Sequence, residues 1–108
     1  MQPTFLGKLT VSSAGTAVPI TSDPTVTACK ILFSTIPGLT GSVYIGGAGL
    51  NQLTLAGVMI KFNAPGGVGE PGYFELETGD GRNSLRVCDY YLDAALSGEG
   101  LLVTYFQE

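Results

Sequence analysis

Hydrophobic and polar residues alternate along much of the chain with a period of two, the pattern of a β-strand that buries one face. No stretch keeps the 3.6-residue period of an amphipathic helix, and turns rich in glycine, proline, serine or aspartate recur about every ten residues. The pattern predicts an all-β fold: one antiparallel β-sandwich domain over residues 1–108, jelly-roll-like, with about eight short strands. A small barrel is the other closed form open to such a chain. The expected strands cover residues 5–11, 16–20, 26–34, 41–46, 53–62, 73–77, 85–92 and 101–106.

The inward side of these strands defines a predicted core. Pro19 lacks an N–H for a sheet ladder, so its strand is expected at a sheet edge. Residues 50–55 could instead form a helical turn, and residues 63–72 contain too much glycine and proline for a regular element. The residues expected to face the core are Phe5, Leu9, Val11, Ile31, Phe33, Val43, Ile45, Phe74, Leu76, Val87 and Val103.

The last two strands predict a terminal hairpin, with residues 93–100 as a small-residue connector closed by glycines. The final strand is apolar on both faces. Leu101, Val103 and Tyr105 point one way, and Leu102 and Phe106 point the other. A strand of a half-solvated sheet should alternate apolar and polar residues, so something is expected to cover the second face. We therefore expect Leu102 and Phe106 to contribute to an interface with another subunit or another protein.

Composition supports a covered surface. Charged residues make up 13% of the chain, about half the usual ~25%. The net charge is −4, and the five basic residues are scattered. A chain without a basic patch is not expected to bind nucleic acid or a membrane surface. No run of about 18 apolar residues is present, and the first residues lack the pattern of a signal peptide, so we expect synthesis in the cytoplasm.

The candidate chemistry is sparse, and we expect no enzyme, metal or cofactor. The chain has no histidine, which removes the usual general base and zinc ligand. Glu75 and Glu77 share a strand face opposite Phe74 and Leu76, which is typical of a solvated face. Residues 67–72 match a dinucleotide-binding glycine pattern, but a strand follows where a helix is required.

The two cysteines, Cys29 and Cys88, lie inside predicted strands, which favours buried free thiols. A disulfide between them remains an alternative. The five tyrosines are typical of β-sandwich cores and interfaces, although they could also form a platform for stacking sugars.

An ordered series of segments resembles small virion proteins of tailed bacteriophages, of the capsid decoration (cement) and head-fibre-base kind. The series runs through Gly-Thr-Ala-Val-Pro-Ile at 15–20, Cys-Lys-Ile-Leu-Phe at 29–33 and Gly-Ser-Val-Tyr-Ile-Gly-Gly at 41–47. It closes with Leu-Asp-Ala at 92–94 and Gly-Glu-Gly-Leu-Leu-Val-Thr-Tyr at 98–105.

The resemblance implies a jelly-roll-like sandwich that performs no catalysis and decorates and stabilises a capsid. Its implied partners are the major capsid protein and further copies of the chain in a homotrimer, and its implied location is the capsid surface of the virion. It transfers no functional residue. The alternatives are a receptor- or carbohydrate-binding module of a phage tail or baseplate and a non-viral β-sandwich interaction domain.

Overall fold

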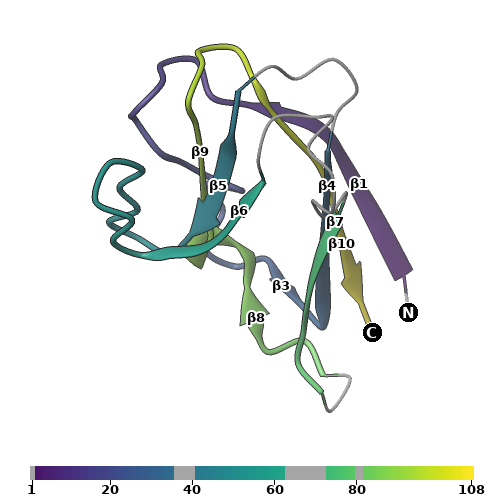
Figure 1. Ribbon diagram of the computed structural model, residues 1–108. Coiled ribbons are helices and arrows are strands. Elements are labelled where there is room, and N and C mark those ends of the chain that lie inside the picture. Colours follow the sequence, from purple (N-terminus) through teal and green to yellow (C-terminus); the bar gives the residue numbers. More distant parts are fainter. Residues whose placement is uncertain (1, 36–40, 63–72, 80–81) are drawn as a thin grey trace.

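The computed structural model describes residues 2–35, 41–62, 73–79 and 82–108, which form an all-β fold with antiparallel sheets. Two four-stranded sheets lie face to face, with a small two-stranded sheet beside them (Figure 1). The strands are β1 (Gln2–Thr10), β2 (Val18–Pro19), β3 (Thr27–Ala28), β4 (Lys30–Thr35), β5 (Val43–Gly46), β6 (Val58–Phe62), β7 (Tyr73–Glu77), β8 (Leu85–Arg86), β9 (Tyr91–Ala94) and β10 (Gly100–Gln107).

The pairing of these strands is nested from the ends of the chain toward its middle. β1 pairs with β10, β2 with β9, β3 with β8, β4 with β7 and β5 with β6. Two further pairings, β10 with β4 and β9 with β5, complete the large sheets. The first sheet has the order β1-β10-β4-β7 and the second has the order β2-β9-β5-β6. Both ends of the described chain therefore lie side by side in the first sheet (Figure 1).

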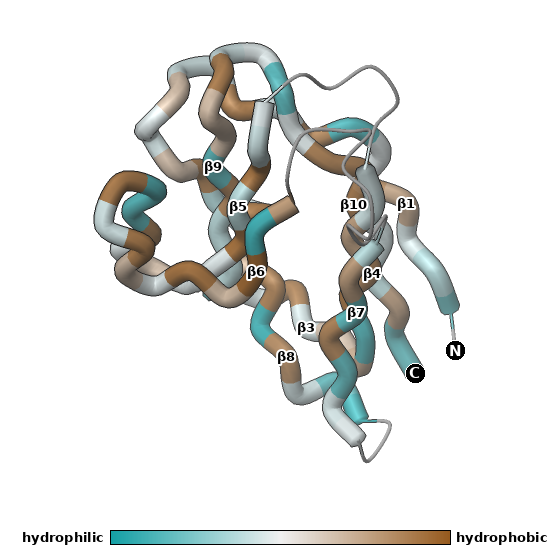
Figure 2. Tube along the Cα trace, in the orientation of Figure 1, coloured by the Kyte–Doolittle hydropathy of each residue, from teal (hydrophilic) through white to brown (hydrophobic). Residues whose placement is uncertain are grey.

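The core fills the space between the two large sheets as one cluster. Alternation along the strands explains most of this core. The apolar inward residues of β4 and β5 are fully buried. Hydrophobic and hydrophilic residues alternate along β7 (Figure 2). Phe33 stacks on Phe74 with ring centroids 6.3 Å apart. Of the predicted core, Leu9, Phe74 and Leu76 are partly buried against the cluster. The predicted core residues that are buried within it are Val11, Ile31, Phe33, Val43, Ile45, Val87 and Val103.

Phe5 is a wrong core prediction, because a β-bulge interrupts β1. The register against β10 shifts between Phe5 and Gly7, and Gly7 has a φ of +73°. An inserted residue reverses the side on which the following residues point. Leu6 and Leu9 therefore pack against the core, while Phe5 is 76% exposed.

The predicted terminal hairpin is also wrong. β9 belongs to the second sheet and β10 to the first, so residues 95–99 connect the two sheets instead of turning within one. The expected strand at 85–92 is divided by a 3-10 turn at Val87–Asp89, and the one at 26–34 is divided at Cys29. The expected strand at 53–62 begins only at Val58, and residues 50–55 form turns without a helix. The predicted loop at 63–72 lies outside the described residues.

Two smaller expectations have clear outcomes. β2, which contains Pro19, is an edge strand of the second sheet, as predicted. Both cysteines are free thiols. Cys29 is buried as expected, and its Sγ lies 3.3 Å from the carbonyl oxygen of Phe106. Cys88 is only half-buried, because it lies in the 3-10 turn and not inside a strand.

Candidate interaction surface

The two large sheets differ in what lies over their outward sides. The outward side of the second sheet carries Tyr44 and Asp93, and both are buried. Residues 47–57 form a loop on this side, away from the first sheet (Figure 1). Gln52 of that loop donates hydrogen bonds from Nε2 to Asp93 Oδ2 at 3.2 Å and to the carbonyl oxygen of Ala94 at 3.0 Å. The chain therefore covers the β5 and β9 part of this side itself, whereas on β6 Lys61 is exposed and Met59 is 48% exposed.

Asp93 is fully buried and joins three segments. Its Oδ1 accepts hydrogen bonds from the backbone N–H of Gly15 at 3.1 Å and of Ala94 at 2.8 Å. Its Oδ2 accepts the bond from Gln52. Gly15 and Gln52 also line a pocket of about 370 Å³, with Ala14, Leu50, Asn51, Leu53 and Ala95. The carboxylate that holds this pocket in place is thus used as a structural acceptor.

The outward side of the first sheet is open and partly apolar. The exposed or half-exposed side chains that register places together on it form what we call the outer face. These residues are Pro3, Phe5 and Lys8 of β1, Leu102, Thr104 and Phe106 of β10, Lys30, Leu32 and Ser34 of β4, and Tyr73, Glu75 and Glu77 of β7.

Both residues predicted for an interface lie on the outer face, in the central strand β10. Leu102 is 39% exposed between Lys8 of β1 and Ser34 of β4. Phe106 is more covered, because the ammonium group of Lys30 lies 5.3 Å from the centroid of its ring. Leu102 is therefore the more available of the two for contact with another molecule.

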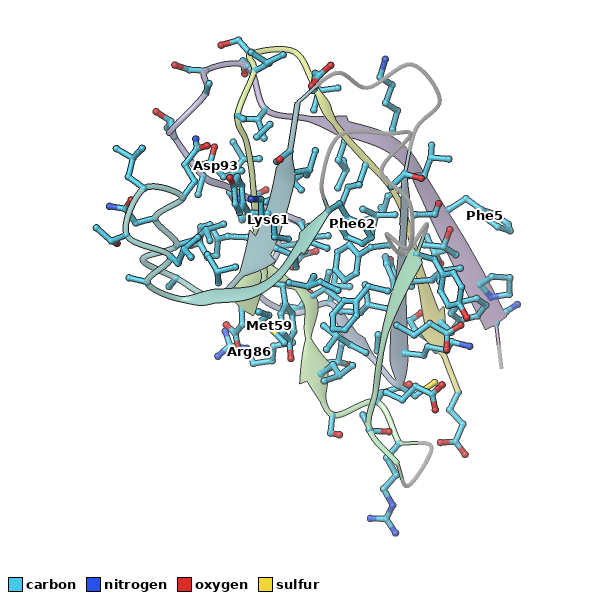
Figure 3. All side chains as sticks on the ribbon, in the orientation of Figure 1. Phe5, Met59, Lys61, Phe62, Arg86 and Asp93 are labelled. Atoms are coloured by element: carbon cyan, nitrogen blue, oxygen red, sulfur yellow. The ribbon has the colours of Figure 1, made fainter. Side chains whose placement is uncertain are left out.

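Sequence reasoning missed the most exposed aromatic residues of this surface. Phe5 projects away from the sandwich (Figure 3), opposite Thr104 in the register of β1 with β10. Tyr73, opposite Ser34, is 63% exposed. The available signal for Phe5 was Gly7, since a glycine inside a strand pattern often marks a bulge.

The charges of the outer face lie toward its two sides. Lys30 Nζ is 3.4 Å from Glu75 Oε2 and 3.9 Å from Glu77 Oε1. Two carboxylates thus share one ammonium group near β7, which leaves that side with one net negative charge. Lys8, on β1, has no ion pair with a carboxylate of the described residues. The outer face is neutral overall, with a basic β1 side and an acidic β7 side.

The tyrosines do not gather at one place. Tyr44 is buried in the second sheet, with Lys61 Nζ 5.9 Å from its ring centroid, whereas Tyr73 lies on the outer face. Tyr105 points inward from β10 and packs against the core. Burial, with a smaller contribution from the charge of Asp89, raises the pKa of Tyr90.

The described residues contain no group of three or more histidine, cysteine, aspartate or glutamate side chains that could hold a metal ion. In the same part of the chain, no helix is long and apolar enough to cross a membrane. Comparison with protein-family models, with curated proteins and with solved structures finds no match for this chain.

Proposed function

We propose that this chain is a structural protein of a bacteriophage virion that decorates and stabilises the capsid from its outer surface. The observation that carries the proposal is the outer face, where Phe5, Leu102 and Tyr73 expose large side chains on a regular sheet. Isolated exposed apolar residues are common, but a contiguous group on a rigid sheet is typical of an interaction surface. In this proposal the partners are the major capsid protein and further copies of the chain in a homotrimer.

The nested strand pairing supports the same proposal. When the separate two-stranded sheet of β3 and β8 is set aside, eight strands remain in two sheets of four. The first strand pairs with the last, the second with the next to last, and so on toward the middle of the chain. We interpret this as a jelly roll, a long antiparallel ribbon folded into two sheets. That architecture is frequent among viral capsid and lectin domains.

The test uses emptied, expanded capsids of the phage that encodes the protein. Purified protein should co-sediment with them up to a fixed number of copies per particle and raise their melting temperature. Phe5→Ser should weaken this binding, and Leu53→Ser should not, because Leu53 is 89% exposed but lies on the loop of the second sheet. Absence of the protein from purified virions, with no co-sedimentation, would refute the proposal.

The alternative is a receptor- or carbohydrate-binding module of a tail or baseplate, and the lectin use of jelly rolls favours it as the second candidate. Such a module should bind cells or glycans as an isolated protein. A glycan array that shows specific binding, together with labelling of the tail rather than the capsid in virion micrographs, would select this alternative.

A further inference from the structure

We propose that a second copy of this chain occupies the outer face, with the β1 side of one copy against the β7 side of the next. The inference rests on the proposed function in that both use the outer face, but it concerns the protein alone, and its test needs no capsid. It names the partner and the orientation of the contact.

Charge complementarity selects the partner. Lys8 on the β1 side has no carboxylate partner among the described residues, and Glu75 and Glu77 on the β7 side share the single ammonium group of Lys30. The outer face of another copy carries the complementary charge at each side. A contact of β1 side with β1 side would instead oppose two lysines, and juxtaposed like charges disfavour an association. The outer faces of two copies therefore match in charge when the β1 side of one meets the β7 side of the other.

The apolar residues lie between the two charged sides. Phe5, Leu102 and Leu32 belong to adjacent strands at neighbouring register positions, so they form a stripe across β1, β10 and β4. A second copy covers this stripe with its own, because every subunit of a symmetric assembly brings the same surface. The ring of Phe5 in particular is ordered on a strand while most of its surface is in solvent.

Pairing at the strand edge is a poorer route to association. β1 is the outermost strand of the first sheet, and its free edge could add a strand from another molecule. However, Pro3 lacks an N–H, Lys8 carries a charge, and the bulge at Gly7 interrupts the ladder. These are three of the devices by which natural edge strands resist such pairing. The face of the sheet is therefore a better contact surface than its β1 edge.

The size of the outer face sets the expected affinity. Four strands about 4.8 Å apart and about five residues long give a surface of roughly 20 by 17 Å. That is well below the roughly 800 Å² that each partner contributes to a standard interface, so association in solution should be weak, in the micromolar range. Attachment of many copies to one particle would raise the local concentration and strengthen the contact.

The decisive experiment is sedimentation equilibrium with charge-reversal variants over a wide concentration range. Lys8→Glu and Glu77→Lys, each alone, should weaken self-association roughly fivefold or more, because each replaces an attraction by a repulsion. The double variant that carries both substitutions restores opposite charges across the contact and should return to within about twofold of the wild type. Phe5→Ser should also weaken association, and Leu53→Ser is the matched control that should not.

A mixture of the two single variants reports the symmetry of the assembly. In a two-fold dimer, one Lys8→Glu chain and one Glu77→Lys chain match at both contacts, so the mixture should associate like the wild type. A ring of three chains built from these two variants always contains one contact between like charges. The mixture should then associate more weakly than the double variant. Either result supports the inference, and the second agrees with a trimer.

Two results would overturn the inference. One is a wild-type protein that remains monomeric at millimolar concentration, and the other is a double variant that associates no better than the single ones. Circular dichroism of each variant establishes that it is folded. A protein that is monomeric in solution but still binds capsids would refute self-association and leave the proposed function standing. Self-association without capsid binding would support the inference and refute the proposed function.

Discussion

Replacement of Asp93 tests how the chain covers its second sheet. Asp93 is fully buried, and its carboxylate accepts hydrogen bonds from Gly15, Ala94 and Gln52. Asp93→Ala removes all three acceptor contacts at once. A hydrogen bond to a charged group contributes about 1.5–3 kcal/mol. The sum over the three bonds is an upper bound on the loss of stability. Water can reach the part-buried donors of Gly15 and Gln52, and removal of a buried charge offsets part of the loss. We therefore expect a loss of about 3–5 kcal/mol in the free energy of unfolding.

Asp93→Asn distinguishes the hydrogen bonds from the two backbone N–H groups from the hydrogen bond that Gln52 donates. An asparagine keeps one oxygen to accept from the two backbone N–H groups, but its amide nitrogen faces the amide of Gln52 as a second donor. The expected loss is about 1–2 kcal/mol, clearly smaller than for alanine. Gln52→Ala should cost a similar amount, and the double variant Gln52→Ala with Asp93→Ala should be less destabilised than the sum of the two by about 1 kcal/mol.

The assay is urea unfolding followed by tyrosine fluorescence, which is clean because the chain has five tyrosines and no tryptophan. Total stabilities of small domains are about 5–15 kcal/mol, so Asp93→Ala removes a large share and could unfold the chain outright. If Asp93→Ala does not fold, the losses in the free energy of unfolding measured for Asp93→Asn and Gln52→Ala still rank the contacts. A loss of less than about 1 kcal/mol for alanine, or equal losses for alanine and asparagine, would refute the reasoning.

Two further predictions concern backbone packing and a surface turn. Gly100→Ala should destabilise the fold by about 3 kcal/mol or more in the same urea assay, because a Cβ there would lie 1.7 Å from the carbonyl oxygen of Leu9. Gly47→Ala, with no atom within 4 Å, should change stability by less than about 0.5 kcal/mol. Hydrogen bonds from the hydroxyl and backbone N–H of Thr25 hold the pKa of Asp23 below 3.8, so its stabilisation is present above that pH and is lost as pH falls through the lowered value. Thr25→Val should raise that pKa in an NMR titration, and an unchanged value would contradict this cause.

Period-two alternation predicted the fold class and most of the core because it reports a local property. Ile31 and Phe33, or Val43 and Ile45, need only a straight strand to share a face. The prediction for Phe5 required the strand to remain regular through Gly7, and one inserted residue was enough to reverse it. The bulge is itself a local feature, so a closer interpretation of Gly7 could have placed Phe5 on the outer face.

The topology could not be obtained in the same way. A short connector such as residues 95–99 can turn a chain back within one sheet or carry it to the opposite sheet, and both uses favour the same small residues. The choice here depends on β1 and β4, the distant strands that flank β10. Asp93 is a comparable case. An acidic residue in a strand is usually exposed, and its burial follows from a loop some forty residues earlier in the chain.

The two outward surfaces differ in what the chain supplies to cover them. On the second sheet, the chain buries the carboxylate of Asp93 and satisfies it with three donors from its own residues. On the first sheet, Phe5 remains in water even though its full burial would be worth about 1.5–3 kcal/mol. The loop that covers Asp93 itself leaves Leu53 89% exposed, so the charges at the two sides of the outer face, and not exposure alone, distinguish this surface. In the assembly that we propose, the outer face is covered after folding by a second copy of this chain.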